Sequence, residues 1–76
     1  MQAEIQAEIE ERLFSEFPDA RLTVELDGNR ALIDIAHEKF GEMNRVQRQQ
    51  AVYACIEDYI ADGRLHAVTI RASESG

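Results

Sequence analysis

Residues 21–36 read RLTVELDGNRALIDIA, and this stretch decides the fold. From Leu22 to Leu26, apolar side chains alternate with polar ones, which is the period of a half-buried β-strand. A second strand resumes over residues 31–36, and the intervening Asp-Gly-Asn is typical of a tight turn, because glycine and asparagine tolerate a positive φ angle. The stretch therefore predicts a β-hairpin with its strands at residues 21–26 and 31–36.

An amphipathic helix is predicted ahead of the hairpin, over residues 3–17. Its apolar stripe repeats every four residues, Phe14 widens the stripe, and glutamates fill most of the opposite face. Pro18 ends this helix, because the residue before a proline is disfavoured in the helical conformation. The stripe must pack against another element, and it consists of Ile5, Ile9, Leu13 and Phe17.

After the hairpin, the pattern returns to helix and then to strand. Residues 37–43 predict one short helical turn, and Asn44 can cap a long helix over residues 45–62. Gly63 follows at the position that a C-cap glycine takes, and a third strand is predicted at residues 65–72. The chain therefore reads as helix, strand, strand, short helix, long helix and strand.

This order predicts one α+β domain over residues 1–72, with a flexible tail at residues 73–76. A helical connection between the second and third strands favours a parallel pair, which gives a three-stranded mixed sheet covered by helices on one face. Parallel neighbours begin at the same edge of a sheet. The start of the third strand, at His66, is therefore expected beside the turn at residues 27–30.

Composition and charge exclude several classes of protein. The 76 residues carry a net charge of −7 and one cysteine, so neither an internal disulfide nor a multi-cysteine zinc site can form. Residues 1–27 contain eight acidic and two basic residues, whereas residues 28–76 contain seven and six, which disfavours strong binding to nucleic acid or an anionic membrane. No apolar stretch reaches the length of a membrane span, and the acidic N-terminal segment is unlike a signal peptide, so a reducing, cytoplasmic location is expected.

Catalysis is not expected either. The sequence contains no glycine-rich phosphate loop and no zinc-ligand spacing. Its three serines lie near a helix end or in the tail without a suggested His–Asp pair, and a chain of this size builds only a thin core. The sequence therefore predicts a protein that is not an enzyme.

Two stretches that follow Phe40 are distinctive, RVQRQQAVY at residues 45–53 and YIADGRLHAVTI at residues 59–70. Through them the chain, from Phe40 onward, closely resembles the BolA family. This resemblance implies a fold similar to the type II KH domain, and a partner rather than a substrate. BolA-like proteins pair with monothiol glutaredoxins and work in iron–sulfur cluster handling, iron regulation and the stress response. The resemblance thus implies an adaptor that is monomeric when alone.

The resemblance also implies a metal ligand. His66 matches the C-terminal histidine that ligates a 2Fe–2S cluster shared with glutaredoxin and glutathione, and no cluster is expected on this chain alone. Relatives usually draw a second ligand, His or Cys, from the loop between the first two strands. Here that loop contains neither, and a guanidinium has no lone pair to give a metal. The expected partner-binding residues are Asp27, Gly28, Asn29, Arg30 and His66.

Three residues keep other interpretations open. His66 could instead be a satisfied core histidine, because its strand parity matches that of Val68 and Ile70 on the side expected to face the helices. Cys55 is interpreted as a small buried hydrophobe, as is usual for a lone helical cysteine among apolar residues. His37 is interpreted as a surface or capping residue, about 20 Å from His66 if the strands are parallel.

A weak nucleic-acid-binding transcriptional regulator is the alternative function. Cations and glutamines gather near the start of the predicted long helix, although a solvated helix face would have the same pattern. A KH-type RNA site needs a GXXG loop, and the matching residues 41–44 lack the second glycine. Any binding of DNA is therefore expected to be weak and salt-sensitive. The candidate residues are Lys39, Arg45, Gln47, Arg48 and Gln49.

Overall fold

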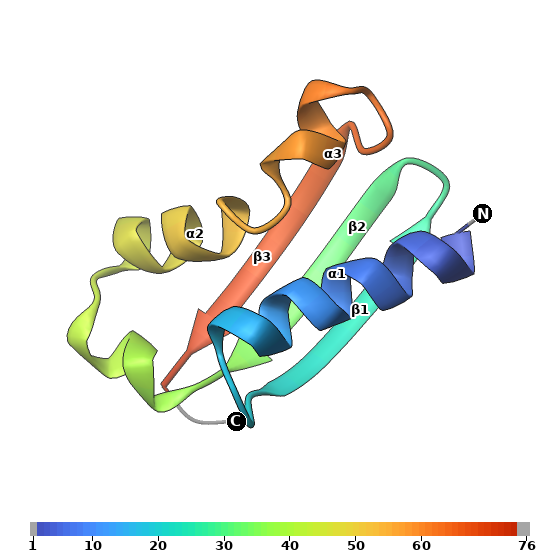
Figure 1. The fold of residues 1–76 in the computed structure, drawn as a ribbon. Coiled ribbons are helices and arrows are strands. Elements are labelled where there is room, and N and C mark those ends of the chain that lie inside the picture. Colours follow the sequence, from blue (N-terminus) through green and yellow to red (C-terminus); the bar gives the residue numbers. More distant parts are fainter. Residues whose placement is uncertain (1, 75–76) are drawn as a thin grey trace.

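The structure is a computed structural model that describes residues 2–74, the side chains of residues 2 and 3 excepted. Within these residues, helices cover one face of a three-stranded mixed sheet (Figure 1), so the predicted α+β class is confirmed. No helix in this part of the chain is long and apolar enough to cross a membrane. In chain order the elements are α1 (Gln2–Glu16), β1 (Arg21–Asp27), β2 (Arg30–Ala36), the 3₁₀ helix η1 (Glu38–Glu42), α2 (Arg45–Tyr53), α3 (Glu57–Ala61) and β3 (Ala67–Ser73).

The hairpin forms as the sequence predicts. β1 and β2 are antiparallel, with a register that runs from Arg21 opposite Ala36 to Asp27 opposite Arg30. The turn between them has two residues, and the first of these, Gly28, has a φ of 61°, which is typical of a type II′ turn. Only glycine adopts that conformation without steric cost. Each strand is one residue longer than predicted.

The second strand pair is parallel. Ala67 of β3 lies opposite Arg30 of β2, and Ser73 lies opposite Ala36, so β2 is the central strand. The start of β3 and the hairpin turn therefore share one end of the sheet, while the segment that follows β2 lies at the other end.

The bounds of β3 differ slightly from the prediction. The strand begins two residues later, because Leu65 turns into the core and its N–H donates to the carbonyl of Tyr59 at 3.0 Å. At its other end β3 continues through Ser73, although the tail is predicted to begin at this residue. Residues 75–76 of the predicted tail lie outside the described residues.

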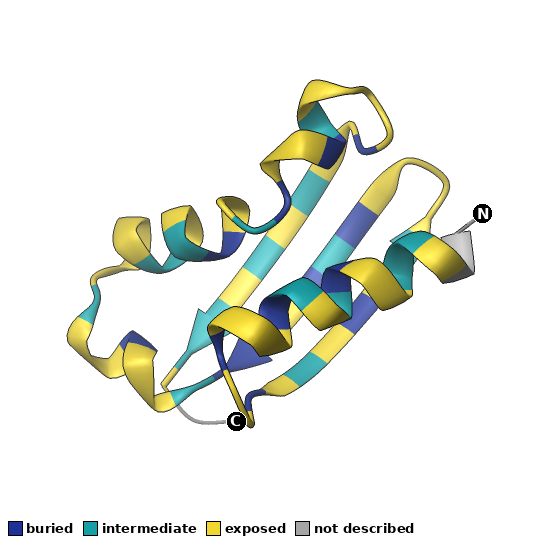
Figure 2. Ribbon diagram, viewed as in Figure 1, coloured by how far each residue is buried: buried dark blue, intermediate teal, exposed yellow. Residues whose placement is uncertain are grey.

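The core lies between the helices and one face of the sheet (Figure 2). Alternate side chains of each strand enter it, whereas Thr23, Asp34 and Thr69 on the opposite face are exposed. Phe14 is 44% exposed, so the prediction that it widens the buried stripe of α1 is wrong. The fully buried side chains are Ile9, Leu13, Phe17, Ile33, Ile35, Phe40, Val52, Ile56, Tyr59 and Leu65.

The predicted long helix at residues 45–62 is wrong, because a turn at residues 54–56 divides it into α2 and α3. The backbone tightens there into bonds between residues three apart, such as that from Cys55 N–H to the Val52 carbonyl at 3.1 Å. The carbonyl of Cys55 accepts instead from Arg12 Nη1 of α1, at 3.3 Å. A contact to a residue 43 positions away thus stabilises the turn, which no local pattern could reveal.

Candidate partner-binding site

The predicted partner-binding residues meet at one end of the sheet, and we call this group the turn-end site. The N–H groups of His66 and Ala67 both donate to the carbonyl of Asn29, at 2.8 and 3.4 Å. These bonds fix the start of β3 against the β1–β2 turn, so the neighbourhood expected from parallel strands is confirmed. The turn-end site consists of Asp27, Gly28, Asn29, Arg30 and His66, all of them exposed.

His66 presents its imidazole to solvent just before β3 begins. Its backbone is held by Asn29, but no hydrogen bond to either ring nitrogen is found within residues 2–74. The ring lies near Gly63, because a Cβ added to that glycine would be 3.9 Å from His66 Nε2. The alternative of a core histidine on the helix-facing side is wrong, since His66 precedes the strand. A neutral imidazole in this position can donate a nitrogen lone pair to a ligand.

The turn-end site contains two side chains that could ligate a metal, the imidazole of His66 and the carboxylate of Asp27. Arg30 lies opposite Asp27 in the hairpin register, and its guanidinium has no lone pair for a metal. Within the described residues, no group of three or more His, Cys, Asp or Glu side chains could hold a metal ion. The turn-end site offers a single nitrogen ligand, from His66.

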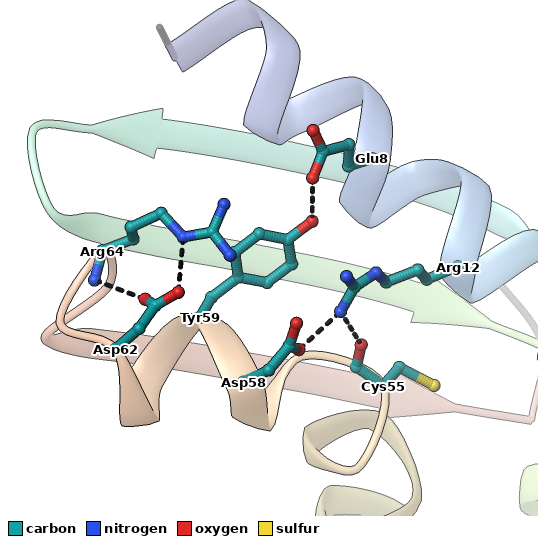
Figure 3. Close-up of polar contacts among 7 residues, drawn as sticks. All are labelled: Glu8, Arg12, Cys55, Asp58, Tyr59, Asp62 and Arg64. Atoms are coloured by element: carbon teal, nitrogen blue, oxygen red, sulfur yellow. Dashed lines mark hydrogen bonds and ion pairs between the residues drawn. The ribbon is translucent and has the colours of Figure 1, made fainter.

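A group of side chains around Tyr59 links α1 to α3 (Figure 3). The Tyr59 ring is fully buried, and the guanidinium carbons of Arg12 and Arg64 lie 4.4 and 4.2 Å from its centroid, within cation–π range. The Tyr59 hydroxyl donates a hydrogen bond to Glu8 of α1. We call this group the Tyr59 cluster, and it consists of Glu8, Arg12, Asp58, Tyr59 and Arg64.

The Tyr59 cluster shifts the pKa values of three of its members, and the hydrogen bond to Asp58 raises the pKa of Arg12. Burial, followed by the hydrogen bond to Glu8, raises the pKa of Tyr59 to about 12. The hydrogen bond from Arg12 lowers the pKa of the exposed Asp58 carboxyl. The cluster also positions the turn-end site, because the Tyr59 carbonyl accepts from Leu65 N–H, next to His66.

Sequence reasoning misses the Tyr59 cluster. Glu8 and Tyr59 are 51 positions apart, and Arg12 and Asp58 are 46 apart, so no local spacing connects them. The single available signal is Arg12 itself, which is the only basic residue among the first 20. A lone arginine in an acidic helix indicates a specific contact.

His37 lies outside the turn-end site and has a structural role. Its Nε2 is 2.9 Å from the carbonyl of Pro18, and its Nδ1 accepts from Lys39 N–H at 3.0 Å, which caps η1. Because Nδ1 accepts, the proton of the neutral ring lies on Nε2 and is donated to Pro18. The prediction of a capping residue is confirmed.

Arg48, a nucleic-acid candidate, is tied to the backbone. Its Nε donates to the carbonyls of Phe40 and Met43, at 2.8 and 3.1 Å, and its Nη1 lies 3.4 Å from the carbonyl of Ala72. These bonds join the η1–α2 segment to the end of β3. Arg48 is therefore half-buried and has a structural role.

The other four nucleic-acid candidates do not form one free patch. Lys39 Nζ donates to a carbonyl at the end of α1 at 3.2 Å, and Gln47 completes a capping box at the start of α2. Arg45 and Gln49 are exposed and line one hollow, whereas Lys39 and Gln47 line another. The candidates are thus divided between two depressions.

Cys55 behaves as a small, partly buried side chain. Its Sγ lies 3.6 Å from the carbonyl of Ala51, one helical turn earlier. Burial raises the pKa of the thiol, which disfavours the reactive thiolate. These contacts agree with the structural interpretation of this residue.

The fold and the site define a class, namely small α+β proteins with a three-stranded mixed sheet and an exposed imidazole at one end. Residues 20–75 match the family described as BolA-like protein. The chain is 43% identical over 65 residues to an uncharacterized protein in the rpoN-murA intergenic region of Acinetobacter guillouiae, covering 86% of this chain and 78% of that protein. It therefore belongs to the BolA family.

Further similarities agree with this assignment. The chain is 46% identical over 46 residues to the acid stress protein IbaG of Escherichia coli strain K12, which covers 60% of this chain and 55% of IbaG. Its fold is similar to that of BolA1 from Arabidopsis thaliana, with a TM-score of 0.80, 25% identity, and 90% and 88% of the two chains covered. For BolA1 from Mus musculus the TM-score is 0.72, with 20% identity and 91% and 63% covered.

Proposed function

We propose that this protein is a non-enzymatic adaptor that pairs with a monothiol glutaredoxin in iron–sulfur cluster handling and iron regulation. Membership of the BolA family supports the class of partner. The observation that carries the proposal is the exposed imidazole of His66, fixed beside the hairpin turn by two bonds to the carbonyl of Asn29. In this proposal the protein is a cytoplasmic monomer when alone, has a type II KH-like topology, and contributes to a stress response.

The number of terminal ligands available determines how a cluster would be shared. A 2Fe–2S centre needs four terminal ligands, and a glutaredoxin thiolate and glutathione supply two. His66 adds a third, but Arg30 cannot add a fourth. The proposed mixed complex therefore holds a cluster less firmly than relatives with a loop His or Cys do. The positive charge of Arg30 favours a carboxylate of the partner or of glutathione, and hence a cluster-free heterodimer.

An NMR titration of the ¹⁵N-labelled chain with a glutathione-loaded monothiol glutaredoxin tests the partnership. We expect amide shifts centred on Asn29, Arg30 and His66, and their loss in His66→Ala. Arg21→Ala is the matched control, because this exposed side chain lies at the other end of the hairpin. Absence of shifts around His66 at high micromolar concentrations would sink the proposal.

The ligand set has its own test, by visible circular dichroism after cluster reconstitution of the mixture. We expect a weak signal for the wild type, a weaker one for His66→Ala, and a stronger one for Arg30→His, which adds a nitrogen ligand beside His66. A signal that is unchanged in both variants would show that these residues do not ligate the cluster.

Weak binding of nucleic acid remains the second candidate function, favoured by the exposed Arg45 and Gln49 in one hollow with Arg71. Two or three cations can meet few phosphates, so the affinity should fall with salt along a shallow slope. Titration with duplex DNA at low salt tests it. Unmoved Arg45 and Gln49 amide signals would dismiss this candidate.

A further inference from the structure

β3 is an edge strand. One of its outward groups, the carbonyl of Ala72, accepts from Arg48 Nη1 at 3.4 Å, so only the part of the edge at Val68 and Ile70 is open. The N–H of Ala67 donates to the carbonyl of Asn29, and the carbonyl of Ser73 accepts from the N–H of His37. Every second residue from Ala67 to Ser73 therefore directs its backbone N–H and C=O groups toward β2. Val68 and Ile70, which have the other parity, turn their N–H and C=O groups outward. Within the described residues no hydrogen bond to these outward groups is found. Such an edge is a template for one more strand.

Two hollows lined by residues of both β3 and α2 form a groove along this edge. Helix α2 lies beside β3 on the side away from β2 (Figure 1). Val68 and Ile70 contribute half-buried side chains to the groove, and α2 contributes Tyr53, which is 41% exposed despite its size. Hollows of about 520 and 510 Å³ at the two ends share Gln49 and Ile70 as lining residues. The two hollows therefore adjoin along the β3 edge.

The two ends of the groove differ in charge. Arg45 and Arg71 line one end, where Asp34 is the one acidic residue among the described lining residues and where Arg48 is already engaged by carbonyls. At the other end Glu57 is the only charged residue among the described lining residues. One end therefore favours a few carboxylates, whereas the other end is mostly apolar and carries the single negative charge of Glu57.

We propose that this groove binds an extended, acidic segment of a partner protein, which joins the sheet as a fourth strand beside β3. The outward backbone groups of Val68 and Ile70 pair with the segment, as in other cases of strand addition. One of its apolar side chains packs on Tyr53, and its carboxylates meet Arg45 and Arg71. The groove is separate from the turn-end site and does not depend on a glutaredoxin.

The opposite edge of the sheet supports the choice of β3. Strand β1 carries Arg21, Glu25 and Asp27 among its seven residues. β3 has only Arg71 as a charged residue, contains no proline, and pairs without a bulge. Proteins usually block edge strands with charges, prolines or bulges. β3 is thus the edge left open for a ligand.

An NMR titration of the ¹⁵N-labelled full chain tests the proposal. The probes are two synthetic peptides of about eight residues that alternate valine and threonine. One peptide ends in two aspartates and the other begins with them, so that both strand directions are sampled. With one peptide we expect shifts and slowed amide exchange at Val68 and Ile70. Arg71→Glu should weaken binding about tenfold, whereas the matched control Arg21→Glu should not.

Several outcomes would overturn the proposal. No shift at millimolar peptide, or shifts centred on β1, would show that β3 does not accept a strand. Shifts caused by a single-stranded oligonucleotide but not by either peptide would make the groove a nucleic-acid site. Shifts that appear on concentrating the protein alone would make the occupant a second copy. In His66→Ala, peptide binding should persist, which separates this result from failure at the turn-end site.

Discussion

The two histidines of the chain lie at opposite ends of the sheet and have opposite surroundings. His37 follows β2, and both of its ring nitrogens are engaged, by the carbonyl of Pro18 and the N–H of Lys39. His66 precedes β3, and only its backbone is held, by Asn29. The ring of His37 is therefore committed to the fold, whereas the ring of His66 is available to a partner. Residue type alone does not separate these roles, but hydrogen bonding does.

The two ends are also held together differently. At the His37 end, aromatic rings pack directly on one another, with Phe17 centred 5.7 Å from His37 and 4.8 Å from Phe40. At the His66 end, the support is indirect and comes from the Tyr59 cluster through the carbonyl that accepts from Leu65. The backbone next to an exposed imidazole is thus held in place by the carbonyl of a residue whose ring is buried.

The largest effect is expected from the Tyr59 cluster at alkaline pH. The pKa of Tyr59 is raised from about 10 in the unfolded chain to about 12 in the fold, so the stabilisation is complete below pH 10 and is lost as the pH rises toward 12. Wild type should lose about 2–3 kcal/mol of unfolding free energy over this range relative to Tyr59→Phe. Urea denaturation at several pH values measures it.

Tyr53→Phe is the matched control, because it removes a hydroxyl from an exposed tyrosine. Its alkaline profile should follow that of wild type. Parallel profiles for wild type and Tyr59→Phe between pH 10 and 12 would contradict the prediction. That result would mean that the fold does not raise the pKa of the Tyr59 hydroxyl.

The hairpin and the position of the turn-end site follow from local rules. Alternation around Val24 and the glycine at position 28 predict the hairpin and its turn. The parallel connection then predicts that His66 lies beside Asn29. The same rules do not predict that His66 is exposed, because they place this residue inside the third strand. The strand begins only at Ala67, since Leu65 turns into the core instead of extending the strand.

The sequence pattern also could not predict that the helix expected at residues 45–62 is divided into α2 and α3. Val52, Ile56 and Tyr59 keep helical spacing across the turn, so the pattern predicts a continuous helix. Arg12 stabilises the turn, because its guanidinium donates to the Cys55 carbonyl and lies over the Tyr59 ring. Tertiary contacts between distant residues override propensity at such places.

A smaller effect is expected at the other end of the sheet. His37→Ala removes the acceptor for Lys39 N–H and the donor to the Pro18 carbonyl, so it should lower the free energy of unfolding by about 1–2 kcal/mol. Chemical denaturation measures the change. His37→Asn restores a capping oxygen but not the bond to Pro18, and should lose less. A cost below about 0.5 kcal/mol for His37→Ala would show that its ring is not committed to the fold.

The smallest effect on stability is expected for His66→Ala. The imidazole is exposed, its ring has no hydrogen bond within residues 2–74, and the bonds from the backbone to Asn29 survive the substitution. The free energy of unfolding should therefore change by less than about 0.5 kcal/mol. The affinity for a glutathione-loaded monothiol glutaredoxin should nevertheless fall at least about tenfold, because few residues dominate binding.

The comparison of the two histidines is tested best when the free energy of unfolding and the affinity for the partner are measured on the same variants. His66→Ala should lose binding and keep stability, whereas His37→Ala should lose stability and, at a temperature where it is folded, keep binding. Calorimetric titration with the partner and denaturation in urea provide the two measurements. If His66→Ala binds as tightly as wild type, the exposed imidazole is not the contact. If it unfolds as readily as His37→Ala, its ring supports the fold, and the contrast between the two ends of the sheet is lost.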